Sequence, residues 1–137
     1  MNINRIPENE LGKGSGIKLA VCDTEHDLYW RMAIEVLEVI KENNDKGEDT
    51  VMVIPYGPLG PYSRLVYLVN RYRVSLKRCT FINMDEYLAD EKTYIDKADP
   101  LSFRGGMDRI FYSQIDDELN VPPENRHFPI PGEEWRV

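Results

Sequence analysis

The chain has 137 residues, of which 42% are hydrophobic and 30% are charged, an ordinary composition for one globular domain with a buried core. Its formal net charge of -7 leaves no basic footprint, which argues against nucleic acid and acidic membrane surfaces as partners. No uninterrupted apolar segment approaches membrane-spanning length, and Met1 to Gly16 lacks the apolar core of a signal peptide. The sequence therefore predicts a cytoplasmic protein.

The two cysteines, Cys22 and Cys79, have neither zinc-site spacing nor a Cys-x-x-Cys arrangement, and we interpret both as reduced core residues. His26 has no second His or Cys at metal-binding spacing, so we expect it on the surface. The sequence predicts no metal site.

Residues 1–16 bury little and predict a flexible lead-in that ends in a Gly-Lys-Gly-Ser-Gly run. The glycines precede an apolar segment, 17–22, which we expect to be a strand. A phosphate-binding loop needs the reverse order, with a strand before the loop and a helix after it. We therefore assign no phosphate role to these glycines.

Acidic residues then open a helix predicted over 25–43, in which Leu28, Met32 and Val36 recur at helical spacing. A turn cluster at 44–49 leads into a short beta-branched strand, 50–54. The next loop holds Tyr56 between prolines and glycines, and a second helix should follow from about residue 61.

The apolar segment 79–84 predicts a strand covered on both faces, and it ends in Asp85-Glu86-Tyr87. Ligands of open parallel sheets bind at the carboxyl ends of strands, so Asp85 and Glu86 should open into a crevice. Repulsion between the two carboxylates and their desolvation would raise a pKa toward that of a general base. The alternative is structural: Asp85 caps a turn, or Glu86 is simply solvated.

Residues 88–100 form a polar stretch long enough for an active-site lid, and a helix is expected over 101–115. The prolines of 127–131 restrict that segment to a sheet edge. The whole pattern predicts an α/β fold with an open parallel sheet and flanking helices. The sheet has few strands, so either the chain is truncated or a partner, such as a second copy in a homo-oligomer, covers the open edge.

The strand end Thr80-Phe81-Ile82-Asn83-Met84-Asp85-Glu86-Tyr87 resembles the Thr-Phe-Asn-Met-Asp-Glu-Tyr motif of the glucosamine-6-phosphate deaminase (isomerase) family, with one extra apolar residue. Two further segments are similar to that family in the right order: 58–62 to its Pro-Leu-Gly-x-Tyr helix start, and 99–103 to its His-Pro-x-Ser-Tyr region. The resemblance covers about 17–132 and corresponds to the amino-terminal half of a family member. Related 6-phosphogluconolactonases usually carry Asp-Glu-Arg, so Tyr87 favours the deaminase branch.

The resemblance implies a Rossmann-like, isomerase/CoA-transferase-like half domain, with 17–137 as its amino-terminal part. It also implies conversion of an amino sugar phosphate to a ketose phosphate and ammonia, without a metal or organic cofactor. Asp85 would carry the proton between C2 and C1, with Glu86 as its catalytic neighbour. The substrate-binding positions would be Tyr56, Gly57, Gly60 and Tyr87.

The sequence departs from the family at two places. Ile54-Pro55-Tyr56-Gly57 replaces the Thr-Gly-Ser-Thr loop that holds the phosphate, and the Gly-x-Gly-x-Asp-Gly-His motif, whose His opens the sugar ring, is absent. We therefore expect a truncated chain that is weakly active or inactive without the missing carboxyl-terminal half. The alternatives are a non-catalytic sugar or sugar-phosphate binding module and a 6-phosphogluconolactonase-like hydrolase.

Overall fold

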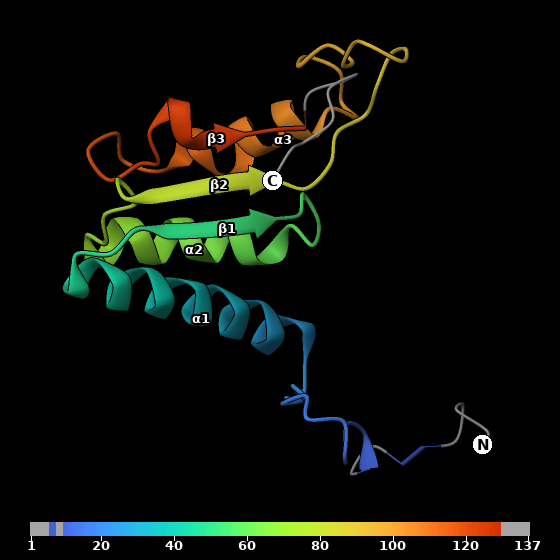
Figure 1. Cartoon of the computed structure of the whole chain (residues 1–137), viewed down its shortest axis with the longest axis vertical. Coiled ribbons are helices and arrows are strands. Elements are labelled where there is room, and N and C mark those ends of the chain that lie inside the picture. Colours follow the sequence, from blue (N-terminus) through green and yellow to red (C-terminus); the bar gives the residue numbers. More distant parts are fainter. Residues whose placement is uncertain (1–5, 8–9, 130–137) are drawn as a thin grey trace.

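The structure, a computed structural model, describes residues 6–7 and 10–129. It has three main helices and three strands (Figure 1). In chain order these are α1 (Glu25–Lys46), β1 (Thr50–Ile54), α2 (Gly60–Tyr72), β2 (Cys79–Asn83), α3 (Phe103–Ile110) and β3 (Arg126–His127), with short 3-10 turns η3 (Tyr112–Gln114) and η4 (Pro123–Asn125) before β3.

The three strands form one parallel sheet in the order β1-β2-β3. The register places Thr50 beside Cys79 and Ile54 beside Asn83, so β1 and β2 end together. This confirms the predicted open parallel sheet with flanking helices. The strand β3 lies at the sheet edge, as predicted for the proline-rich segment, although it begins at Arg126; residues 130 and 131 of that prediction lie outside the described residues.

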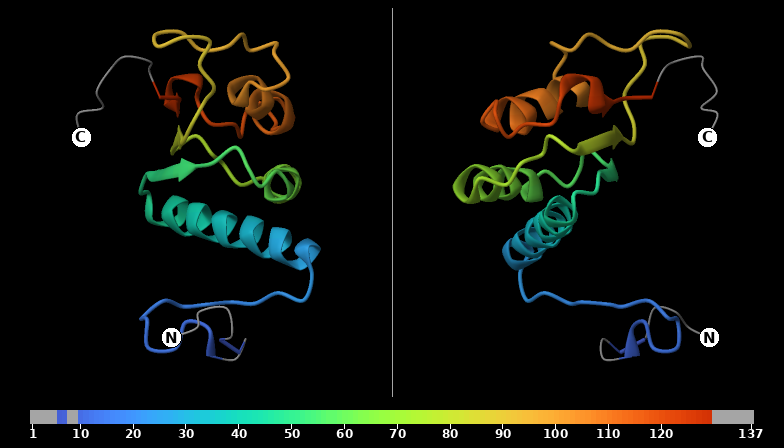
Figure 2. Two further views of the ribbon diagram at one scale, coloured as in Figure 1. Left: turned by 90° about the vertical axis from the view of Figure 1, so that its right-hand side faces the viewer. Right: turned by 60° about the vertical axis from the view of Figure 1, so that its left-hand side comes forward.

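The three helices lie on one side of the sheet (Figure 2). The β2 residues Cys79 and Phe81 point into this covered side and are fully buried. On the β1 strand, Val51 and Val53 are 64% and 62% exposed. On the central strand itself, Thr80 and Ile82, which alternate with the buried residues, are partly buried. The described helices thus cover one face of this strand, and the second covered face predicted for it is not present among the described residues.

The core joins α1 and α2 to the sheet and to the segment after α3, through Ile40, Val69, Phe81 and Phe111. The helix α1 starts as its acidic first turn predicted, with the Thr24 hydroxyl accepting from the backbone of Asp27. It runs three residues past the predicted end at residue 43, to Lys46, and Gly47 follows as its cap. That glycine adopts the left-handed conformation that closes a helix (φ 73°).

Two predicted elements differ. Residues 17–22 are not a strand, because no other strand pairs with them: Ile17, Leu19 and Val21 are exposed, and Cys22 is partly exposed rather than in the core. The helix predicted over 101–115 is shorter, because Ser102 caps it at its start and a 3-10 turn replaces its last part. Among the described residues, no helix is long and apolar enough to cross a membrane.

Candidate active site at the carboxyl edge of the sheet

The candidate site lies where β1 and β2 end and where α2 and α3 begin (Figure 1). A hydrogen bond of 2.9 Å from the backbone N–H of Met84 to the carbonyl of Ile54 continues the strand pairing past the end of β2. The short loop 55–59 and the long loop 84–102 leave the sheet from this edge. The sequence placed its candidate residues on these two loops and at the start of α2.

Asp85 is exposed and lies near the first turn of α2. Its negative charge helps to raise the pKa of the Tyr62 phenol, although burial and the neighbouring Tyr112 contribute more. The Tyr62 hydroxyl donates to the carbonyl of Pro55, which fixes the ring beside the strand ends. The desolvated setting predicted for Asp85 is therefore not provided by the described residues.

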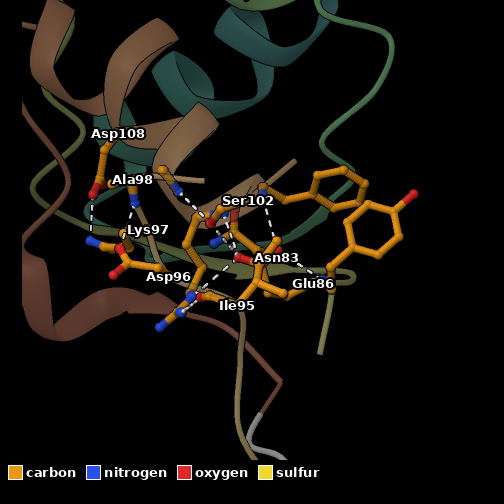
Figure 3. A network of polar contacts seen from close by, with 12 residues as sticks. Asn83, Glu86, Ile95, Asp96, Lys97, Ala98, Ser102 and Asp108 are labelled. Atoms are coloured by element: carbon orange, nitrogen blue, oxygen red, sulfur yellow. Dashed lines mark hydrogen bonds and ion pairs between the residues drawn. The ribbon is translucent and has the colours of Figure 1, made fainter. Parts of the chain in front are cut away.

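Glu86 turns inward instead, and no part of its side chain is exposed (Figure 3). Its oxygens accept hydrogen bonds from the Ser102 hydroxyl, at 3.0 Å, and from the backbone N–H groups of Phe103 and Arg104, at 2.9 and 2.8 Å. Arg104 Nε, at 3.1 Å, and the Glu86-adjacent backbone N–H of Tyr87, at 2.8 Å, also donate to it. Glu86 therefore holds the start of α3.

These contacts also settle the direction of the Glu86 pKa. Burial alone would raise the pKa, but the hydrogen bonds from the Arg104, Phe103 and Tyr87 backbone and from the Ser102 hydroxyl outweigh it and lower the pKa. The prediction that crowding raises it toward that of a general base is wrong for Glu86. Its carboxylate is the negative group at the positive end of a helix, a structural arrangement.

The loop 88–100 is irregular, as predicted, but it is attached to α3. The Arg104 guanidinium donates to the carbonyl of Ile95 at 2.9 Å and lies 4.1 Å from the centroid of the Tyr94 ring. Lys97 forms an ion pair with Asp108 of α3 (Figure 3). Because Glu86 and this loop both contact the first turn of α3, they form one connected unit.

Three aromatic rings meet at the same edge. Tyr56 stacks on Phe103 with ring centroids 4.6 Å apart, and Tyr87 meets Phe103 edge-on at 5.0 Å. The structure thus brings together two predicted substrate-binding residues through a third that the sequence reasoning missed. The available signal was the Ser102 cap, which makes Phe103 the first residue of α3 and directs it to this edge.

The two predicted glycines have different surroundings. A side-chain carbon on Gly60 would lie 2.0 Å from the Tyr29 ring of α1, so the close contact of α1 with α2 requires a glycine there. Gly57 has no neighbouring atom within 4 Å of such a carbon. The surroundings of Gly60 explain this glycine by helix packing, whereas Gly57 remains free to approach a ligand.

A cavity of about 270 Å³ lies beside the end of β1, between α1 and α2, but its lining is apolar: Met32, Ala33, Val36, Met52, Val53, Ile54, Pro55, Pro58, Pro61, Tyr62, Leu65, Phe81 and Phe111. A sugar needs several hydrogen-bonding groups, which this lining does not offer. The polar chemistry of the edge is therefore confined to the loops above it. In the part of the chain described, no three His, Cys, Asp or Glu side chains gather as they would around a metal ion.

The fold and this edge define a Rossmann-like α/β protein whose central strand ends in one free and one buried carboxylate. No protein-family model matches the sequence. Curated relatives do: it is 30% identical to the glucosamine-6-phosphate deaminase of Borrelia garinii over 111 residues, which are 77% of this chain and 40% of the relative. It is 25% identical to that of Malacoplasma penetrans over 118 residues, 85% of this chain and 44% of the relative.

A solved structure gives the same result. A monomeric glucosamine-6-phosphate deaminase of the NagB superfamily matches with a TM-score of 0.69 and 26% identity, over 86% of this chain and 44% of that protein. These similarities support the glucosamine-6-phosphate deaminase family that the motifs predicted. It spans less than half the length of the curated relatives it matches.

Proposed function

We propose that the chain supplies the proton-transfer part of a glucosamine-6-phosphate deaminase-like site in amino sugar metabolism, with Asp85 as the proton carrier. In this reaction the Asp85 carboxylate takes a proton from C2 of the open-chain amino sugar phosphate and returns it to C1. Water then replaces the amine at C2, and the products are fructose 6-phosphate and ammonia. The family relationship motivates this chemistry.

The observation that carries the proposal is the division of work between neighbouring carboxylates. Glu86 is fully engaged at the start of α3, whereas Asp85 follows the same central strand and is exposed at the ligand-binding edge. Asp85 is thus the carboxylate of this pair that is free to reach a substrate. We assign Glu86 a positioning role, because it fixes the backbone next to Asp85.

The aromatic group of Tyr56, Phe103 and Tyr87 supports a sugar-binding edge. Aromatic faces pack against the apolar faces of sugar rings, and Tyr87 also carries a hydroxyl that can form hydrogen bonds. Tyr87 is 50% exposed and is therefore accessible to a ligand.

Proton transfer can be tested without loss of ammonia, on the open-chain form of fructose 6-phosphate that arises without an enzyme. In deuterated water, a base at Asp85 should exchange the C1 hydrogen of fructose 6-phosphate, which NMR measures directly. We expect slow exchange with the chain and none with Asp85→Asn. The control Glu91→Gln removes an exposed carboxylate of the adjacent loop and should leave the exchange unchanged.

Exchange that persists in Asp85→Asn would overturn the assignment of the base. If the chain binds sugar phosphates but exchanges no hydrogen, the altered loop 54–58 would favour the second candidate, a non-catalytic binding module. In that loop Pro55 and Pro58 lack the amide hydrogens that a phosphate-binding loop uses.

A further inference from the structure

A second group of polar and aromatic side chains lies across the first two turns of α1 and of α2. It lines a surface hollow of about 430 Å³, and we call it the Arg64 cluster: His26, Trp30, Ser63, Arg64 and Tyr67. Both helices start near the end of the sheet where the strands end (Figure 1). Neither the sequence motifs nor the family resemblance involves these residues.

The Arg64 guanidinium is held in one place. Its central carbon lies 5.3 Å from the centroid of the Tyr29 ring and 5.7 Å from that of Trp30. One end, Nη1, donates to the carbonyl of Gly60 at 2.7 Å. Side-chain packing and this hydrogen bond therefore fix the orientation of the opposite edge, which carries Nε and Nη2.

That opposite edge has donors without enough acceptors. Arg64 Nε is buried and has no hydrogen-bond partner among the described residues. Arg64 also forms no ion pair with a carboxylate in the described part of the chain, in contrast to Arg73 and Arg104. A buried, unpartnered donor of a charged group is costly, so its persistence calls for an acceptor.

His26 does not provide enough acceptors for the neighbouring donors. Trp30 Nε1 lies 3.0 Å from His26 Nε2, and Arg64 Nη2 lies 3.1 Å from His26 Nδ1, so both ring nitrogens face donors. A neutral imidazole has only one nitrogen that accepts, and a protonated one has none. At least one of the two donors is therefore left without an acceptor, in addition to Arg64 Nε.

We propose that the Arg64 cluster binds a phosphate-type oxyanion at the Nε and Nη2 edge of Arg64. A guanidinium offers two parallel N–H groups along this edge, which match two oxygens of a phosphate. The exposed His26 ring moves off the edge to admit the anion. The Trp30 and Tyr67 rings, 6.0 Å apart and perpendicular, form an aromatic wall for the rest of a phosphorylated molecule.

This inference does not depend on the deaminase reaction, because none of the cluster residues takes part in it. The chain has a net charge of -7, so an anion can bind only where a local positive group attracts it. The guanidinium of the Arg64 cluster is such a group. Through its hydrogen bond to the Gly60 carbonyl, Arg64 is tied to the start of α2, the helix that follows the loop 54–58.

Trp30 reports on binding. The chain has two tryptophans, so Trp135→Phe leaves Trp30 as the single tryptophan. Titration with inorganic phosphate at constant ionic strength should change its fluorescence in a saturable way. If the bound anion is part of a phosphorylated sugar, glucosamine 6-phosphate should bind more tightly than inorganic phosphate. Glucosamine, which has no phosphate, should not compete with either ligand. Equal affinity for phosphate and glucosamine 6-phosphate would place only the anion in the cluster.

In the same background, Arg64→Gln should weaken phosphate binding about tenfold or more, since two charge-assisted hydrogen bonds are lost. Arg71→Gln, which removes a positive charge from the exposed last turn of α2, should leave the affinity unchanged. Arg64→Lys keeps the charge but not the two-pronged edge, so it should bind more weakly than the parent; it carries the test if Arg64→Gln fails to fold. No saturable response to phosphate, or equal losses in the Arg64 and Arg71 variants, would overturn the proposal.

Discussion

The helices α2 and α3 both begin at the carboxyl edge of the sheet, but their first turns are completed in opposite ways. The start of α3 receives a buried carboxylate, Glu86, and a capping hydroxyl, Ser102, whose oxygen accepts from Gly105 at 3.1 Å. The start of α2 has neither: Leu59 stands at its cap position with no side-chain hydrogen bond, and the first turn holds no acidic residue.

The difference teaches which helix start is still open to a ligand. At α3 the protein's own carboxylate occupies the place that a substrate anion would take, and the helix is closed to it. The first turn of α2 contains no acidic residue of its own, although Asp85 lies near it, and Arg64 adds a positive charge one turn along. In the site we propose, an anionic group of the substrate would find its electrostatic partner on the β1–α2 side, and Asp85, which follows β2, would supply the free acid.

The largest expected effect comes from removing the Glu86 carboxylate that binds the start of α3. Glu86→Ala should lower the free energy of unfolding by about 3–5 kcal/mol, the usual cost of leaving a buried ion pair and its hydrogen bonds without one partner. Urea denaturation followed by circular dichroism measures the change. The exposed neighbour Asp85→Ala should alter stability by less than about 0.5 kcal/mol, as expected of surface positions. Equal effects of the two changes would contradict the assigned division of roles.

The sequence predicted the position of Glu86 at the sheet edge but not its structural role. The motif and the strand placed both carboxylates at the right edge, because strand ends and ligand edges coincide in parallel sheets. Which carboxylate turns inward depends on Ser102 and Arg104, which are distant in sequence and reach Glu86 only through the irregular loop 88–100. Periodicity and motif spacing do not show how the loop 88–100 brings the chain back to Glu86.

The strand predicted at 17–22 failed for a different physical reason. Alternating apolar residues make a segment capable of forming a strand, but a strand also needs an edge to pair with. In the structure Ile17, Leu19 and Val21 remain exposed, and the free edge of β1 lies elsewhere. By contrast, β1, β2 and the two long helices were predictable, because each packs its apolar residues against a neighbour close in sequence.

A second test examines the other helix start, at Gly57, which precedes α2, and at Gly60, its first residue. Gly60→Ala should destabilise the protein by about 1–3 kcal/mol, since the new methyl group would overlap the Tyr29 ring and force α1 from α2. Gly57→Ala is the matched control and should be tolerated, because no atom lies near the added carbon. Thermal unfolding of the two variants compares them, and a larger loss for Gly57→Ala would contradict the packing explanation.

A third test uses pH. The folded-state pKa of Glu86 is lower than its unfolded value, which is about 4.3 for a free glutamate. Its contribution to stability is therefore complete above about pH 4.3 and is lost as the pH falls through the lowered folded-state pKa. Denaturation midpoints should fall more steeply below that pH in the parent than in Glu86→Gln, which cannot titrate. Parallel pH profiles would show that the hydrogen bonds to Glu86 do not depend on its charge.

The smallest expected effect comes from adding a carboxylate to the start of α2, as Glu86 provides one at the start of α3. Leu59→Asp places a carboxylate at the uncapped start of α2, and Leu59 itself is 46% exposed, so little apolar packing is lost. We expect a gain in unfolding free energy of about 0.5 kcal/mol from the helix dipole, which high salt should reduce. Leu59→Asn is the uncharged control, and its smaller gain would isolate the charge. If the two variants are equally stable at low salt, a negative charge at the start of α2 does not stabilise the helix. The difference between α2 and α3 would then lie only in the hydrogen bonds that cap α3.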